Sequence, residues 1–152
     1  NGGGGPDMLI GDVGGVTSGS YSLTFMIDKA AGISTAEFNL MKAAVNDLLS
    51  KFNGISQLQV EIGTFSNNAQ VVGTYTTVAD AQAAINGLTP GTSNTNYEAA
   101  LKTLNTMVSL DPSADKRIVY LLTDGAPTTG AWLDTAACGR HDKFELFIRS
   151  SY

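Results

Sequence analysis

The chain has 152 residues, of which 43% are hydrophobic and 15% are charged, a composition typical of one folded domain with a hydrophobic core. Its net charge of −5, with only nine Lys and Arg residues, argues against a nucleic-acid partner. No stretch approaches the roughly 18 consecutive apolar residues of a transmembrane helix, and the single cysteine excludes a disulfide within the chain.

The first 20 residues are rich in glycine and indicate a linker. Within it, Gly2 to Ile10 fit the repeat Gly-Gly-x-Gly-x-Asp-x-apolar-x, whose tight turns present backbone carbonyls and a carboxylate, here Asp7, to Ca²⁺. Such turns bind calcium between stacked copies, so this run is either the remnant of a repeat array or a chance run of glycines. Because neither an initiator Met nor a signal peptide is present, we expect the chain to be a piece of a longer protein.

A buried strand is predicted over Tyr21 to Asp28, because its apolar run suits a central strand that is covered on both faces. Asp28 ends this run. A buried carboxylate needs a partner, so Asp28 either caps the following loop through backbone N–H groups or belongs to a binding site.

The rest of the chain alternates helices and strands. A helix is predicted to begin at Ser34, which has capping-box spacing with Glu37, and an apolar stripe continues to Phe52. Two more amphipathic helices are predicted over residues 78–88 and 97–110. Three more strands are predicted over residues 58–65, 69–77 and 118–122. The first two of these strands alternate apolar and polar residues, which indicates a half-exposed hairpin near a sheet edge.

This order of elements predicts an α/β fold with a mostly parallel sheet flanked by helices. The last predicted strand also ends at an acid, Asp124, and a polar loop containing Thr95 precedes the third helix. Sites in such sheets lie beyond the carboxyl ends of the strands, so Asp28, Thr95 and Asp124 are expected to meet there.

Three segments, FMIDKAAGIS, NTNYEAAL and VYLLTDGAPTTG, resemble the metal-site loops of a von Willebrand factor type A (VWA) domain. The resemblance covers about residues 20–130 and implies a Rossmann-like sheet. With the glycine-rich repeat upstream, the chain most resembles the VWA domains of secreted bacterial repeats-in-toxin (RTX) proteins and adhesins. This resemblance implies a non-enzymatic adhesion domain, secreted or on the bacterial cell surface, that binds a protein or glycan partner.

The resemblance also implies a Mg²⁺ or Mn²⁺ ion held by Asp28, Thr95 and Asp124 and completed by an acidic group of the ligand. This fits the preference of Mg²⁺ for hard oxygen ligands. The two serine positions of the family's first loop, however, fall on Ala30 and Gly32. The metal-ion-dependent adhesion site (MIDAS) is thus expected to be degenerate: either weak, with water or Ser34 replacing the hydroxyls, or vestigial.

The remaining residues, 131–152, have no counterpart in the family pattern, which should continue for about 50 residues after the fourth strand. We therefore divide the chain into a linker (1–20), a VWA-like domain (21–130), apparently truncated after its fourth strand, and a divergent or truncated tail (131–152). Cys138 and His141 have the spacing of a metal pair, but two ligands are weak evidence for zinc.

Two functions remain open from the sequence. One is an adhesion or protein-interaction domain that binds its partner at the carboxyl end of the sheet, with or without a weakly held cation. The alternative is a structural spacer with a vestigial metal site. An enzyme is not expected, because the only histidine, His141, lies in the divergent tail and no Gly-x-Ser-x-Gly turn is present.

Overall fold

The computed structural model describes residues 19–108, 114–123 and 145–149. In this part of the chain, helices and strands follow in the order β1 (Ser20–Asp28), α1 (Thr35–Ser50), β2 (Gln57–Phe65), β3 (Ala69–Tyr75), α2 (Val78–Gly87), α3 (Tyr97–Val108), β4 (Lys116–Leu122) and β5 (Glu145–Arg149). None of the helices in these ranges is both long enough and apolar enough to span a membrane.

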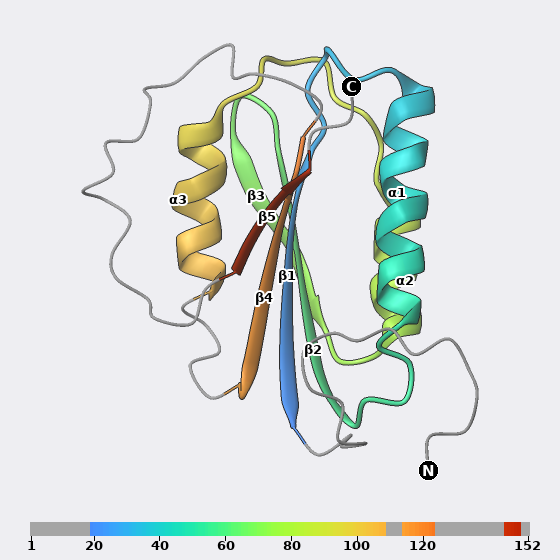
Figure 1. The fold of residues 1–152 in the computed structure, drawn as a ribbon. Coiled ribbons are helices and arrows are strands. Elements are labelled where there is room, and N and C mark those ends of the chain that lie inside the picture. Colours follow the sequence, from blue (N-terminus) through green and yellow to red (C-terminus); the bar gives the residue numbers. More distant parts are fainter. Residues whose placement is uncertain (1–18, 109–113, 124–144, 150–152) are drawn as a thin grey trace.

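The strands form one sheet in the order β3-β2-β1-β4-β5 (Figure 1). β1 lies at its centre and pairs in parallel with β2 and β4, while β3 pairs antiparallel with β2. The predicted α/β class with a mostly parallel sheet is confirmed. β5, in the segment that the sequence left open, adds a further parallel strand beside β4.

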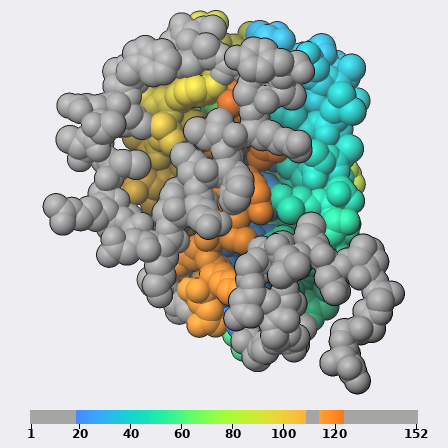
Figure 2. Space-filling model, in the orientation of Figure 1, coloured from blue at the N-terminus to red at the C-terminus, as the bar shows by residue number. Residues whose placement is uncertain are grey.

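Helices cover both faces of the sheet, with α1 and α2 on one face and α3 on the other (Figure 1). Figure 2 shows α1 and α3 on opposite sides of β4. β1 serves both layers because its side chains alternate: Phe25 and Ile27 belong to the core beneath α1 and α2, whereas Met26 packs with Leu104 and Met107 of α3. Burial on both faces explains why residues 25–27 of β1 are apolar in succession.

The local signals for α1 are confirmed. Ser34 is its N-cap, and the reciprocal capping box with Glu37 is present. After the helix, Gly54 adopts a φ of 89°, a left-handed conformation that a side chain disfavours, and this lets the chain turn into β2. The sequence alone therefore predicted the start of this helix.

The expected exposure of the hairpin is only half right. β3 is an edge strand of the described sheet, but β2 is buried along most of its length. Glu61 of β2 is only 1% exposed, and its carboxylate accepts hydrogen bonds from Gln59 Nε2 at 3.0 Å and Thr24 Oγ1 at 3.5 Å. Alternation of polar residues misled the prediction because Glu61 is buried together with its hydrogen-bond partners.

Candidate functional site

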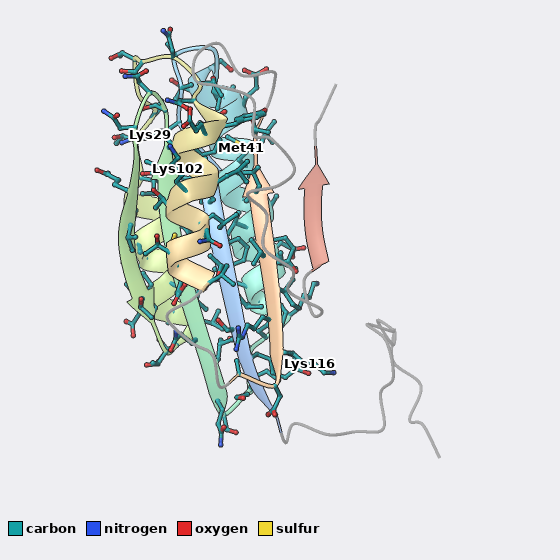
Figure 3. All side chains as sticks on the ribbon, turned by 90° about the vertical axis from the view of Figure 1, so that its left-hand side faces the viewer. Lys29, Met41, Lys102 and Lys116 are labelled. Carbon is teal, nitrogen blue, oxygen red and sulfur yellow. The ribbon has the colours of Figure 1, made fainter. Side chains whose placement is uncertain are left out.

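Three loops meet at the carboxyl ends of β1 and β2, at the top of Figure 1. They are residues 29–34 between β1 and α1, residues 66–68 between β2 and β3, and residues 88–96 between α2 and α3. We call these three loops the apex. Figure 3 shows Lys29 at the apex and Lys116 at the opposite end of the sheet.

Asp28 lies directly below the apex, at the end of the central strand, and is fully buried. Its Oδ1 accepts a hydrogen bond from the Ala30 backbone N–H at 2.9 Å, and its Oδ2 accepts one from the Thr123 hydroxyl at 2.8 Å. The contact to Ala30 is the backbone cap that the sequence offered as one role for this residue. The contact to Thr123 joins positions 95 residues apart in the chain.

Thr123 follows β4 and extends this hydrogen-bonded group to α3. Its Oγ1 lies 3.0 Å from the hydroxyl of Tyr97, the first residue of α3. The Tyr97 ring packs edge-on against Phe65 of β2, with the ring centroids 6.0 Å apart. The ends of β1, β2 and β4 and the start of α3 are thus joined through Asp28, Thr123, Tyr97 and Phe65.

The loop of residues 88–96 is fixed to the loop after β1 by two backbone hydrogen bonds. Gly91 N–H donates to Lys29 O at 2.6 Å, and Ala31 N–H donates to Ser93 O at 2.8 Å. A Cβ on Gly91 would lie 2.6 Å from Lys29 O, closer than real Cβ atoms approach, so glycine is required for this contact.

Asn96 connects the same loop to the β2–β3 turn. Its backbone N–H donates to Ser66 O at 2.9 Å, and its Nδ2 donates to Asn67 O at 3.1 Å. Its Oδ1 also accepts from Ala99 N–H at 3.1 Å, which caps the start of α3. Thr95, immediately before Asn96, is buried, with 8% of its surface exposed.

The structure thus places two of the three predicted ligands, Asp28 and Thr95, in the same region. Asp124 lies outside the described residues, as do the repeat containing Asp7 and the pair Cys138 and His141. The sequence analysis missed the contributions of Thr123 and Tyr97. Their positions next to Asp124 and close to Thr95 were the available signal, but only the fold brings their hydroxyls together.

The exposed surface of the apex is almost uncharged. Lys29, which is partly buried, is the only charged side chain in residues 29–34, 66–68 and 88–96. The exposed side chains in these loops are mainly hydroxyls and amides, from Ser34, Asn67, Asn68, Thr89, Thr92, Ser93 and Asn94. This surface suits recognition by neutral hydrogen bonds.

The described residues fit a tightly held cation poorly. They contain no group of three or more His, Cys, Asp or Glu residues that could hold a metal ion. Where the family pattern has two serine hydroxyls, Ala30 presents a buried methyl group, 1% exposed, and Gly32 presents no side chain. A carboxylate at Asp28 and a hydroxyl at Thr95 remain, too few for the six oxygen ligands of Mg²⁺ unless water supplies the rest.

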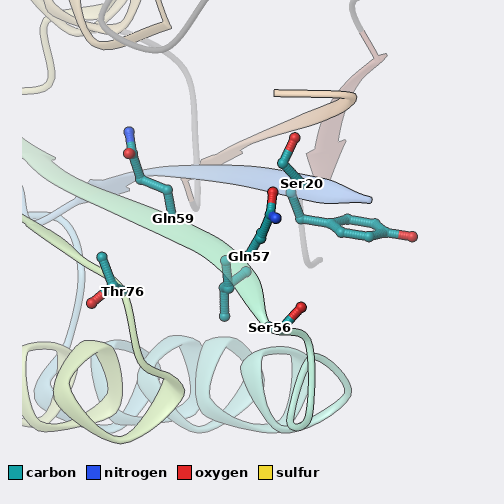
Figure 4. Close-up of a pocket in the computed structure, with 7 residues that line it drawn as sticks. Ser20, Ser56, Gln57, Gln59 and Thr76 are labelled. Carbon is teal, nitrogen blue, oxygen red and sulfur yellow. The ribbon is translucent and has the colours of Figure 1, made fainter. Parts of the chain in front are cut away.

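A hollow of about 270 Å³ lies at the end of the sheet opposite the apex (Figure 4). It is lined mainly by neutral polar side chains, including Ser56, Gln57, Gln59 and Thr76. Neither Asp28 nor Thr95, the two predicted ligands that the structure describes, lines it. It is slightly smaller than the roughly 300–1,000 Å³ of typical small-molecule sites, and the described residues that line it carry no charged side chain.

Comparisons with solved structures show the same fold in proteins of two kinds. Proximal thread matrix protein 1 from the mussel byssus matches with a TM-score of 0.63 and 26% identity, over 74% of this chain and 31% of that chain. A structure of that protein with a zinc-occupied MIDAS motif matches with a TM-score of 0.63 and 27% identity, over 72% and 30% of the two chains.

The second kind is represented by pilus proteins. The type V pili tip protein Mfa5 from Porphyromonas gingivalis matches with a TM-score of 0.60 and 15% identity, over 70% of this chain and 20% of that chain. The pilus adhesin SpaC from Lactobacillus rhamnosus GG matches with a TM-score of 0.61 and 17% identity, over 72% and 15% of the two chains. At these identities the likeness concerns the fold alone.

This chain spans less than a third of the length of each of these proteins. A comparison with curated proteins found no match. The family model of the von Willebrand factor type A domain matches residues 23–126, which include most of β1, all of β2 to β4 and all three described helices. The chain therefore belongs to the von Willebrand factor type A domain family.

Proposed function

We propose that this chain is a non-enzymatic adhesion or protein-interaction domain of a larger secreted or cell-surface protein, and that the apex binds its partner. The observation that carries the proposal is the network that fixes the three apex loops to one another. Hydrogen bonds join residues 88–96 both to Lys29 and Ala31 and to Ser66 and Asn67. Loops held in this way lose little conformational entropy when a partner binds.

The similar structures support this proposal because they include a pilus adhesin, a pilus tip protein and a thread matrix protein. The surface chemistry of the apex indicates the kind of contact that it would make with a partner. With hydroxyl and amide side chains exposed and Lys29 as the one charge in its loops, the apex matches neutral hydrogen-bonding groups of a protein or a glycan.

A divalent cation enters this proposal only as a weakly held addition. Asp28, Thr95 and Asp124 would hold Mg²⁺ or Mn²⁺, with water completing the coordination, and the cation would supply a positive charge at the apex. The zinc-occupied MIDAS motif of the mussel protein supports a metal at this place in a related domain. The missing hydroxyls at Ala30 and Gly32 make the proposed affinity low.

A specific observation favours the spacer as a second candidate. Both carboxylate oxygens of Asp28 already accept hydrogen bonds from protein donors, as a vestigial site would require.

For the remaining regions we propose a linker over 1–20, with an RTX-like repeat whose Asp7 binds Ca²⁺ when neighbouring repeats are present, and a divergent segment over 131–152.

The test is a binding screen of the immobilised domain against purified matrix proteins and glycans, with one variant at each end of the sheet. Asn94 at the apex and Gln57 at the opposite end are both exposed. We expect Asn94→Arg to weaken binding roughly tenfold or more, while Gln57→Arg leaves it unchanged. Thermal unfolding should be unaffected in both variants.

Three outcomes separate the candidates. Selective loss in Asn94→Arg supports the apex as the binding face. Loss in Gln57→Arg alone would move the binding face to the opposite end and contradict the proposal. Failure to bind any ligand in the screen favours the spacer.

A further inference from the structure

The end of β1 presents a conflict between the family's metal chemistry and the residues of this chain. Asp28 is fully buried, and an isolated buried carboxylate is strongly unfavourable unless positive charge or hydrogen bonds compensate it. In a MIDAS the cation contributes to that compensation. Here the two hydroxyl positions are Ala30 and Gly32, so a cation would have few ligands.

Protein hydrogen bonds provide the compensation. The Ala30 N–H and the Thr123 hydroxyl each donate to a different oxygen of Asp28, at 2.9 and 2.8 Å. Hydrogen bonds to a charged acceptor are among the stronger ones in proteins. Both contacts are buried, where exchange with water does not weaken them.

The direction of the hydrogen bonds extends the network to α3. Thr123 donates its single hydroxyl proton to Oδ2 of Asp28. The Tyr97 hydroxyl, 3.0 Å from Thr123 Oγ1, must then be the donor in that pair. The protons therefore run from Tyr97 to Thr123 and from Thr123 to Asp28, which links the start of α3 to the ends of β4 and β1.

We infer that this chain of hydrogen bonds replaces the cation: Tyr97 and Thr123 are positioning residues that hold Asp28 and the apex together without metal. It follows that the domain is fully assembled in the absence of divalent ions, and that it gains no measurable stability from them because two hydroxyls are missing. The inference concerns the same region as the proposed function, but it needs no partner, so each can fail without the other.

The first test measures the unfolding midpoint in EDTA and in millimolar Mg²⁺ or Mn²⁺. We expect the wild-type midpoint to be the same in all three conditions. Tyr97→Phe keeps the ring packed on Phe65 but removes the hydroxyl that donates to Thr123. Thr123→Val keeps the shape of the side chain but removes the hydroxyl that donates to Asp28. Each should lower the midpoint by about 5 °C or more.

Tyr21→Phe is the matched control at the other end of β1. The Tyr21 hydroxyl has no hydrogen-bond partner among the described residues, and its ring contacts with Phe52 and Lys116 survive the change. We expect its midpoint to equal that of the wild type. If Tyr97→Phe and Thr123→Val behave like this control, the inference is wrong.

The second test restores the missing ligands with Ala30→Ser and Gly32→Ser in one chain. A Cβ on Gly32 meets no heavy atom within 4 Å, and Gly32 does not adopt a left-handed φ, so serine fits there. Gly32→Ser alone is the folding control, because position 32 is exposed whereas Ala30 is buried. We expect Mg²⁺ or Mn²⁺ to raise the midpoint of the double variant but not that of the wild type.

The difference in metal response between the double variant and the wild type tests whether the two missing hydroxyls are the reason that the wild type gains no stability from a cation. Isothermal titration with Mn²⁺ checks it independently of unfolding and should detect binding to the double variant only. A wild-type domain that gains as much stability from Mg²⁺ or Mn²⁺ as the double variant would show that a cation already occupies the site. That result, or a double variant that folds but does not respond, would overturn the inference.

Discussion

The contact between Gly91 and Lys29 gives a sharp test of how the apex is held. In Gly91→Ala, the new Cβ would lie 2.6 Å from the Lys29 backbone oxygen, and no side-chain rotation can relieve that contact. The loop must move, which breaks or stretches the Gly91 N–H to Lys29 O hydrogen bond. Overpacking of this kind costs about 1–3 kcal/mol, and the hydrogen bond contributes about 1 kcal/mol.

Alanine also restricts the unfolded chain, which offsets about 0.4–1 kcal/mol of this loss. We therefore expect Gly91→Ala to lower the free energy of unfolding by about 1–3 kcal/mol, measured by urea denaturation with a constant m-value. Gly87→Ala is the control. Gly87 lies in the last turn of α2, and its Cβ would meet nothing within 4 Å, so that variant should gain up to about 1 kcal/mol.

The reasoning would be refuted if Gly91→Ala were as stable as the wild type, because the loop would then tolerate a displacement that the structure excludes. Equal destabilisation in Gly87→Ala would also contradict it, since the loss could not be assigned to the contact with Lys29. Hydrogen exchange of the Ala31 amide, which donates to Ser93 in the same pair of loops, gives a local readout and should accelerate only in Gly91→Ala.

Three further outcomes are expected. Phe25→Ala should cost about 3–5 kcal/mol in the same urea assay, because Phe25 is fully buried and stacks on Tyr120 with centroids 4.9 Å apart; a loss below about 1 kcal/mol would contradict this packing. Ser34→Ala should cost about 1 kcal/mol through loss of the α1 N-cap, with exposed Thr35→Ala in the same helix as the neutral comparison. Hydrogen bonds from the Ser34 hydroxyl and backbone N–H lower the pKa of Glu37, so its stabilising effect is present above its ordinary pKa and is lost as the pH falls through the lowered value. Glu37→Gln should remove that part of the acid sensitivity, and an unchanged pH profile would show that the capping carboxylate does not contribute.

Much of the fold follows from local sequence signals. The apolar run that ends at Asp28, the capping box of Ser34 and Glu37 and the spacing of apolar residues in the helices each reflect interactions between near neighbours in the chain. These signals predicted the described elements from β1 to β4, and the order of strands and helices predicted the parallel sheet. Local periodicity predicted the wrong exposure for Glu61, because this residue is buried with a hydrogen bond from Thr24 of another strand.

The candidate site divides in the same way. The sequence by itself predicted Asp28 and Thr95 as site residues and showed that Ala30 and Gly32 lack the family's hydroxyls, because residue identity alone decides which ligands exist. Only the tertiary structure revealed the second hydrogen bond to Asp28, since its partner Thr123 is 95 residues away and comes within hydrogen-bonding distance only when β4 pairs with β1. Hydrogen bonds act over about 3 Å, so the bond from the neighbouring Ala30 backbone is a local contact, whereas the bond from Thr123 depends on strand pairing.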